Sequence, residues 1–385
     1  MRGAIATAAA AALLLGAAAG CGGGEDAAAP RATGTGTGTG TAPAADAPVT
    51  RTVAAPPDRP TLRQVVGQHM VFAYSGLTPP LALRQRIACG EAAGVILFAR
   101  NIRSAAQVKA TVAKLQAIKR PAGLDAPLLV MVDHEGGSVR RLPGPPAKGA
   151  SQTPSPAAAR AYGRAAGALL RGAGVNVDLA PVVDVGRADS ALANEGRVYD
   201  DDAPNVIAKA GAFAQGLRAA GVAPVLKHFP GFGAASVNTD DAVARIDLPL
   251  ATLRAVDLKP YERIEAPAVM LSTAIYPRVD PRPAAFSRRW ATTELRDRLK
   301  FGGVTITDDL QAAAVVRYGS PAQLAYFATK AGVDLPLFAK DYATGARAAA
   351  GLEKAVEQGA LKRADLQSGA ARVLAWRADL QQPGR

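Results

Sequence analysis

The sequence has few of the residues that build disulfide scaffolds and metal sites. Its 385 residues include two cysteines and three histidines, too few for a disulfide-built scaffold or a cysteine-based zinc cluster. The histidines, His69, His134 and His228, are scattered along the chain, which argues against a His-rich metal site. Aromatic residues make up 5% of the chain, and no long run of lysine or arginine occurs. We therefore expect no metal ion and no nucleic-acid partner.

Hydrophobic residues are plentiful, and basic residues outnumber acidic ones. The hydrophobic share of 49% and the charged share of 20% predict that most of the chain folds around a core. The net charge of +13 is dispersed along the sequence. In an exported domain it would favour attraction to anionic lipids or wall polymers, but an arginine-rich solvated surface explains it equally well.

The first 20 residues have the pattern of an export signal. Arg2 precedes an apolar run at 4–19, which is shorter than the roughly 20 residues that a membrane-spanning helix needs. Small residues directly before Cys21 resemble a bacterial lipobox, although alanine stands three residues before the cysteine, where leucine is more usual. We predict a lipoprotein signal peptide at 1–20, with Cys21 as the lipidated first residue of the mature protein. Ordinary signal cleavage is the alternative.

The next segment, residues 21–59, is rich in Gly, Ala, Thr and Pro and has no hydrophobic periodicity. Such a composition buries too little apolar surface to offset the entropy of ordering, so we expect a flexible, disordered tether. The protein would then be exported and lipid-anchored at the outer face of the bacterial cytoplasmic membrane, or periplasmic. Residues 60–385 would form its one folded domain, which we expect to be a monomer.

Eight short apolar runs alternate with longer helical segments from residue 60 onward. The runs lie at 70–74, 94–99, 127–133, 175–181, 223–229, 268–274, 303–309 and 333–338. Continuous apolar runs are typical of parallel strands covered by helices, and amphipathic segments at 104–120, 157–173 and 205–221 could supply this cover. The alternation favours an α/β fold with a single (β/α)8 TIM barrel; a doubly wound open sheet is the runner-up. No glycine-rich dinucleotide fingerprint or P-loop follows any run, so no nucleotide cofactor is expected.

Charged residues lie at or just after the ends of four of these runs. They are, in chain order, Asp133, Asp178, Asp184, Lys227, His228, Asp308 and Asp309. Burying such groups costs desolvation energy unless they pair with each other or serve a polar site. In TIM barrels, catalytic groups lie where strands end and βα loops begin. We therefore predict that these residues converge on one rim.

Several of these segments resemble motifs of the family 3 glycoside hydrolases. KHFPGFG (227–233) occurs together with GVILFARN (94–101), VDHEGGSVRRL (132–142), NVDLAPVVDV (176–185) and TDDL (307–310), in the family's order. The resemblance runs from about residue 62 to 376 and is greatest to the single-domain bacterial β-N-acetylhexosaminidases. It implies a (β/α)8 barrel without metal or organic cofactor. It also implies retaining hydrolysis of terminal β-linked sugars, often N-acetylglucosamine from peptidoglycan fragments.

The resemblance assigns the nucleophile to Asp308, at the end of the seventh run. This carboxylate would attack the anomeric carbon to form a glycosyl-enzyme, and a nearby cation should keep it ionised. Alternatively, Asp308 or Asp309 caps a following helix. The residues matched to substrate binding are Asp133, Arg141, Arg197, Lys227 and His228.

The substrate-binding assignment has one local alternative, because Asp133 and Arg141 could form an ion pair that binds no ligand. Gly136, Gly137 and Gly231 are expected to shape turns rather than to contact substrate.

The loop after KHFPGFG departs from the family's pattern. In the hexosaminidases a histidine on this loop is the acid/base, and an aspartate two residues earlier holds it. Here Asp240 stands in place of that histidine and Asn238 in place of the aspartate, and no histidine follows His228. Asp240 or Asp241 could act as a carboxylic acid instead, with a pKa raised when the loop excludes water. The alternative is a solvated acidic turn, with the acid supplied from elsewhere in the protein or with substrates whose leaving groups need little protonation.

Three functions remain open on the sequence alone. The leading hypothesis is an exported glycosidase that acts on β-N-acetylglucosaminides, with Asp308 as nucleophile and Asp240 as acid. The second is a non-catalytic glycan-binding lipoprotein with a degenerate hydrolase barrel. The third keeps the barrel and changes the sugar, as in a β-glucosidase or a phosphorylase of the same family. In each case the partners are a glycan, such as a peptidoglycan fragment, and a membrane reached through Cys21.

Overall fold

The computed structural model describes residues 59–380. The predicted signal peptide, the predicted lipidation of Cys21 and nearly all of the predicted tether fall on residues 1–58 and so lie outside the described residues. Within 59–380, no helix combines the length and the apolar character that crossing a membrane requires.

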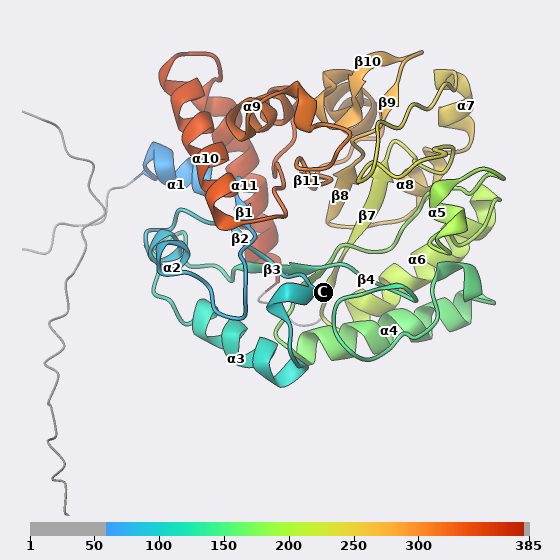
Figure 1. Ribbon diagram of the computed structural model, residues 1–385, viewed down its shortest axis with the longest axis horizontal. Helices are drawn as coiled ribbons and strands as arrows, with labels where there is room; N and C mark the ends of the chain where they lie inside the picture. Colours follow the sequence, from blue (N-terminus) through green and yellow to red (C-terminus); the bar gives the residue numbers. More distant parts are fainter. Residues whose placement is uncertain (1–58, 381–385) are drawn as a thin grey trace, which may run out of the picture. The chain divides into compact units, whose positions relative to one another are not determined.

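Seven parallel strands form one curled sheet in chain order (Figure 1). They are β1 (Val71–Phe72), β2 (Gly94–Ile96), β3 (Leu129–Val132), β6 (Val177–Asp178), β7 (Ala223–Phe229), β8 (Ala268–Leu271) and β11 (Val304–Thr307). Each lies within one of the predicted runs, and every residue of these strands is buried. Complete burial explains why the runs are continuously apolar.

The eighth predicted run, 333–338, is not a regular strand. It makes single parallel bridges to both edge strands, from Leu335 to Ile306 of β11 and from Phe338 to Phe72 of β1. Side chains take part in its hydrogen bonds: Asp334 Oδ2 accepts from Thr305 N at 2.9 Å, and a threonine hydroxyl of β11 accepts from Leu337 N at 2.9 Å. The prediction of eight regular strands is therefore wrong in its last member. The predicted parallel α/β sheet is confirmed, and the bridges span its two edges.

Helices surround the sheet (Figure 1). Those after the strands are α2 (Leu81–Ala88), α3 (Ala105–Gln116), α4 (Pro156–Gly172), α6 (Ala203–Ala219), α7 (Leu250–Ala255), α8 (Lys259–Arg263), a π-helix (Arg289–Arg298), α9 (Pro321–Ala331) and α10 (Tyr342–Glu357). The predicted segments 104–120, 157–173 and 205–221 correspond to α3, α4 and α6. Helices α4 and α6 can approach closely because Gly163 has no side chain: a Cβ at this position would lie 2.1 Å from Phe213 O.

The two ends of the described chain pack against each other. Helix α1 (Leu62–Gly67) precedes β1, and α11 (Arg363–Asp379) is the last helix. His69 Nε2 lies 2.8 Å from Leu366 O of α11. The buried Arg377 guanidinium donates to Pro127 O and to the Gln68 side chain. These contacts fix the N-terminal ends of β1 and β3 beneath the sheet and leave the opposite ends of the strands to the loops.

Four of these loops at the C-terminal ends of the strands matter for function. The hairpin of β4 (His134–Gly136) and β5 (Val139–Arg140) follows β3, and the short helix α5 (Ala191–Asn194) follows β6. A loop without helix or strand runs from Pro230 to Pro249 after β7. After β11, a turn-rich segment precedes α9. The remaining hairpin, β9 (Ile275–Tyr276) with β10 (Asp280–Pro283), follows β8.

Candidate active site

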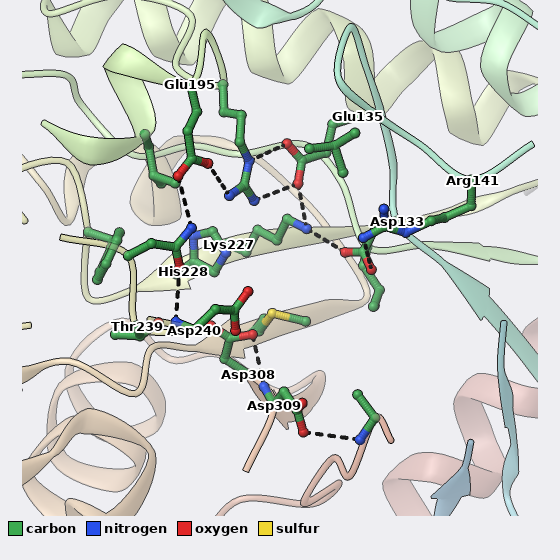
Figure 2. A pocket seen from close by; sticks show the side chains of 18 of the residues that line it. Asp133, Glu135, Arg141, Glu195, Lys227, His228, Thr239, Asp240, Asp308 and Asp309 are labelled. Carbon is green, nitrogen blue, oxygen red and sulfur yellow. Dashed lines mark hydrogen bonds and ion pairs between the residues drawn. The ribbon is translucent and has the colours of Figure 1, made fainter. Parts of the chain in front are cut away.

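A cavity of about 300 Å³ lies where these loops meet. The structure places all seven predicted catalytic and sugar-binding residues in its lining: Asp133, Arg141, Arg197, Lys227, His228, Asp240 and Asp308. Further polar residues of the lining are Glu135, Glu195, Asn238, Thr239 and Asp309. Figure 2 shows most of these side chains around one opening. Lys227 and His228 of β7 therefore do meet residues that follow β3, β6 and β11 at one end of the sheet.

Lys227 lies in β7, and its side chain is only 2% exposed. Its Nζ atom is 2.7 Å from Asp133 Oδ1 and 2.8 Å from Glu135 Oε1. Burial lowers the pKa of Lys227, but attraction by Asp133 and Glu135 outweighs burial and raises it. The ammonium thus stays charged and orients the Asp133 carboxylate at the cavity wall.

Glu135 was not singled out from the sequence. Burial raises the pKa of this carboxyl, but Lys227 and Arg197 lower it far more and hold it well below its usual range. Arg197 donates to both Glu135 oxygens, from Nε at 2.9 Å and from Nη2 at 2.8 Å. The sequence did indicate that Glu135 lies near Asp133. Glu135 follows Asp133 by two residues, and alternate residues of an extended chain share one face.

His228 is held from behind by Asp184. The Asp184 carboxylate accepts from His228 Nδ1 at 2.8 Å, from His228 N at 3.1 Å and from Phe232 N at 2.7 Å. This contact assigns the proton to Nδ1 and leaves Nε2 as the ring nitrogen available to a ligand. Phe232, which stands in place of the motif's histidine, packs edge-on to His228 with the ring centroids 5.9 Å apart.

Two of the predicted rim residues are not in the cavity lining. Asp184 lies behind His228, and Asp178 is fully buried, with Oδ1 accepting from His134 N at 2.9 Å. Burial raises the pKa of Asp178 well above its ordinary value. Its Oδ2 atom has no partner among the described residues. For Asp178 and Asp184 the predicted convergence on the rim is therefore wrong; both support the loops from below.

Asp308 and Asp309 end β11. Asp308 Oδ1 accepts from Asp309 N at 2.9 Å. Asp308 forms no direct ion pair within residues 59–380, but the cations Arg141, Arg197 and Lys227 line the same cavity. The next helical segment begins only at Val316, and neither carboxylate caps it. Asp309 Oδ1 instead accepts from Gln311 N at 2.9 Å and from Ala339 N at 3.0 Å.

The environment of Asp309 disfavours its ionised form. Burial raises the pKa of Asp309 to about 6, and nearby Asp308 and Asp240 add to the rise although two backbone N–H groups oppose it. In Figure 2 its carboxyl is bonded to the backbone of the segment after 338. Asp309 therefore joins β11 to that segment and adds to the negative charge around Asp308.

Asp240 is presented by the loop after β7. It is exposed at the cavity mouth. Partial desolvation and the neighbouring Asp308 carboxylate raise the pKa of Asp240, while His228 and Arg197 oppose this rise. Asp241 is also exposed but does not line the cavity, so the geometry favours Asp240 over Asp241 as a proton donor.

The ion pair between Asp133 and Arg141 is long and partly exposed, unlike a purely structural ion pair. Arg141 Nη2 lies 3.8 Å from Asp133 Oδ2, and the Arg141 side chain is 31% exposed. Its guanidinium also lies 5.8 Å from the centre of the Phe98 ring. Both charged groups therefore have hydrogen-bonding capacity left for a ligand.

Glycines shape the turns around the cavity. Gly136, Gly137 and Gly231 all have positive φ values, of 99°, 58° and 117°, which confirms the expectation that they form turns. A Cβ at Gly231 would lie 2.5 Å from the Asp257 Cβ.

The described residues contain no group of three or more His, Cys, Asp or Glu side chains that could hold a metal ion.

Comparisons with known proteins agree with this geometry. The model of the "Glycosyl hydrolase family 3 N terminal domain" matches residues 62–376. An "Uncharacterized secreted glycosyl hydrolase" of Arthroderma benhamiae is 38% identical over 84% of this chain and 95% of its own length. A "Beta-hexosaminidase" of Pseudomonas aeruginosa is 37% identical over 70% of this chain and 82% of its own. The crystal structure of a β-N-acetylhexosaminidase from Beutenbergia cavernae is 34% identical, with a TM-score of 0.76 over 83% of this chain and 99% of that one.

Proposed function

The chain belongs to glycosyl hydrolase family 3, and we propose on this premise that it hydrolyses terminal β-N-acetylglucosaminides with retention of configuration. That it is a β-hexosaminidase-like glycoside hydrolase follows from its relatives. The observation that carries the finer proposal is one cavity that joins Asp308 and Asp240 to a cluster of sugar-binding cations and carboxylates.

The sugar-binding side of the cavity is formed by Asp133, Arg141, Lys227 and His228. The Asp133 carboxylate accepts hydrogen bonds from vicinal hydroxyls, while Lys227, which already holds Asp133 at 2.7 Å, donates to a hydroxyl oxygen. Arg141 has donors to spare because its Nε atom has no partner among the described residues. Together these groups bind the terminal sugar and present its anomeric carbon to Asp308.

The reaction then proceeds in two displacements. The Asp308 carboxylate attacks the anomeric carbon as the bond to the glycosidic oxygen breaks, and the Asp240 proton passes to that oxygen. Water next attacks the glycosyl-enzyme and gives its proton to the Asp240 carboxylate, which releases Asp308 and returns the β-anomer. The raised pKa of Asp240 supports its role because a general acid has to hold its proton in the free enzyme.

Hydrolysis of an aryl β-N-acetylglucosaminide tests the proposed activity directly. We expect turnover by the wild type and a loss of several orders of magnitude in Asp308→Ala, and proton NMR should show the β-anomer as the first product. Parallel assays with an aryl β-glucoside, and with phosphate in place of water as acceptor, decide between the hexosaminidase and the glucosidase or phosphorylase. The absence of turnover, or equal turnover by Asp308→Ala, would contradict the proposal.

A non-catalytic glycan-binding protein is the second candidate. The observation in its favour is that Asp240 and Asn238 stand in place of the family's histidine and aspartate, and that Asp240 is exposed. Calorimetry with N-acetylglucosamine oligosaccharides separates the two candidates. Tight binding by the wild type without hydrolysis over days would support the binding protein and contradict the enzyme.

We also propose that the protein is exported and anchored through lipidated Cys21, and that wall fragments are its substrates. The N-terminal sequence supports this, and the secreted Arthroderma relative is compatible with export. Detergent partitioning of wild type and Cys21→Ala tests the anchor. The wild type should partition into the detergent phase and Cys21→Ala into the aqueous phase. Light scattering coupled to size exclusion should show a monomer.

A further inference from the structure

Glu195 connects the sugar-binding cluster to the loop that carries Asp240. Glu195 follows α5, and its two oxygens have different partners. Oε2 accepts from Arg197 Nη1 at 3.0 Å, and Oε1 accepts from Asn238 Nδ2 at 2.9 Å. Because Arg197 also grips Glu135, which contacts Lys227, the hydrogen-bonded chain runs without a break from the sugar site to the loop. Figure 2 shows this series of contacts along the cavity wall.

Asn238 joins the series to the proposed acid. Its Oδ1 atom accepts from Asp240 N at 3.1 Å, while its Nδ2 atom donates to Glu195. Only this orientation of the amide satisfies both partners, since Glu195 offers no donor and the backbone N–H offers no acceptor. A carboxylate at position 238 would instead face the Glu195 carboxylate at hydrogen-bond distance and be repelled. The presence of Glu195 thus explains why an amide stands at position 238.

The other side of the loop is held by backbone contacts. Ala314 N donates to Thr239 O at 3.1 Å, and Ala313 N lies 3.4 Å from Asp240 O. These contacts attach residues 239–240 to the segment that follows Asp308. On the β6 side, the start of the loop is held by Asp184, which accepts from Phe232 N at 2.7 Å, and by Ala191 N, which donates to Ala235 O at 2.8 Å. The Asn238–Glu195 hydrogen bond ties the part of the loop next to Asp240 to the same side.

We propose that Glu195 and Asn238 are positioning residues that hold the Asp240 carboxyl over the glycosidic oxygen of a bound sugar. This inference rests on the proposed role of Asp240 as proton donor. In the family's pattern an aspartate holds the acid through its side chain. Here Asn238 holds the acid through its backbone and leaves the carboxyl of Asp240 free to carry the proton. The link through Arg197 and Glu135 couples this position to the residues that bind the sugar.

An exchange of the two side chains tests the pairing. Asn238→Asp places two carboxylates against each other, and Glu195→Gln leaves one of two donors without an acceptor. In the double variant the glutamine amide donates to the new carboxylate and its oxygen accepts from Arg197, so the hydrogen-bond pattern is restored. We expect each single variant to lose about 10- to 100-fold in kcat/KM for chitobiose, which is part of the roughly 10²- to 10⁴-fold that a positioned general acid contributes. The double variant should recover most of this loss.

The leaving group separates positioning from general damage. A dinitrophenyl leaving group needs little protonation, so kcat/KM for dinitrophenyl β-N-acetylglucosaminide should remain nearly unchanged in all three variants. Ser236→Ala is the matched control, because Ser236 is exposed on the same loop and outside the cavity lining. It should leave both substrates unaffected. Equal losses on both substrates, or no recovery in the double variant, would overturn the inference.

Hydrogen exchange provides a readout that does not depend on catalysis. Peptides that cover residues 234–246 should exchange faster in Asn238→Asp and Glu195→Gln than in the wild type, and at the wild-type rate in the double variant and in Ser236→Ala. If the wild type hydrolyses no glycoside, the proposed function fails, and the exchange data still decide whether Glu195 holds the loop. Identical exchange in all variants would refute this positioning even in an active enzyme.

Discussion

Lys227 Nζ lies 2.8 Å from Glu135 Oε1, at the centre of an almost fully buried ion cluster. Arg197 binds the same carboxylate through two hydrogen bonds, and Asp133 takes a second contact with Lys227. A buried ion pair repays its desolvation cost only if the remaining donors and acceptors are satisfied. The Glu135 carboxylate meets this condition with three donors. We therefore regard Glu135 as the residue that keeps both cations of the sugar site in place.

Replacement of Glu135 by glutamine should destabilise the fold strongly. The variant leaves Lys227 and Arg197 as buried cations with too little compensating charge, which costs about 3–5 kcal/mol. Urea unfolding at pH 7 measures the loss. Glu265→Gln, which changes an exposed carboxylate, is the control and should shift the free energy of unfolding by less than about 0.5 kcal/mol. A loss in Glu135→Gln no larger than in this control would contradict the proposed role of the cluster.

The pH dependence of kcat/KM should reveal Asp240 as the proton donor. Its pKa is raised in the free enzyme, and only the protonated acid assists departure of the leaving group. For chitobiose, kcat/KM should therefore fall as the pH rises through this pKa. With a dinitrophenyl leaving group, or in Asp240→Asn, this alkaline limb should vanish. Asp241→Asn, on the neighbouring exposed residue, should keep it. An alkaline limb that persists in Asp240→Asn would assign the proton to another group.

Most of the fold could be predicted from the sequence because parallel strands that are buried on both faces have continuously apolar sequences. The exception, residues 333–338, is also largely apolar, although it contains Asp334 and Pro336. It differs because Asp334 and the β11 threonines replace part of the backbone ladder with side-chain hydrogen bonds. A hydrophobic pattern predicts that a segment is buried, but it does not predict whether backbone or side-chain atoms form the hydrogen bonds of that segment.

The candidate site was predictable where a charged residue interrupts an apolar run, as Lys227 and Asp308 do. Glu135, in β4 of the hairpin after β3, and Glu195, directly after α5, were missed because neither interrupts one of the apolar runs. Their importance arises from Arg197, which is distant from Glu135 in sequence. Asp178 and Asp184 were placed wrongly for a related reason. Their positions in and after a predicted strand are visible in the sequence, but their contacts with His134 N and with His228 come from residues distant in sequence.

Asp309→Asn should stabilise the protein above pH 6. Burial raises the pKa of Asp309 from 3.8 to about 6, so the folded state binds a proton more tightly than the unfolded state does. Stability therefore falls as the pH rises from about 4 to 6 and stays reduced above. At about 1.4 kcal/mol per pKa unit, the ionised carboxyl costs up to about 3 kcal/mol. Asparagine keeps the Oδ1 acceptor for Gln311 N and Ala339 N.

The measurement is the melting temperature of Asp309→Asn and of the wild type between pH 4 and pH 8. The difference between the two proteins should be small at pH 4, grow as the pH rises to about 6, and stay nearly constant above. Asp308→Asn serves as the comparison, because Asp308 lacks the two backbone bonds that fix the Asp309 carboxyl. A difference for Asp309→Asn that is constant with pH would show that charge at this position does not affect stability.

Replacement of Asp184 by asparagine should impair catalysis through His228. The carboxylate fixes the ring by accepting from Nδ1, so that Nε2 is presented to the sugar. Asparagine can turn its NH2 group toward Nδ1 and favour the other tautomer, in which Nε2 carries the proton and no longer accepts. Loss of the partner that orients a metal-binding histidine typically costs about 10- to 100-fold in affinity or activity, and we expect a loss of about this size in kcat/KM for chitobiose. The effect should be absent in a His228→Ala background, since no ring is left to orient. Kinetics of the two single variants and the double variant measure this non-additivity. If the effects of Asp184→Asn and His228→Ala simply multiply, Asp184 acts through the fold of the loop at Phe232 and not through the histidine.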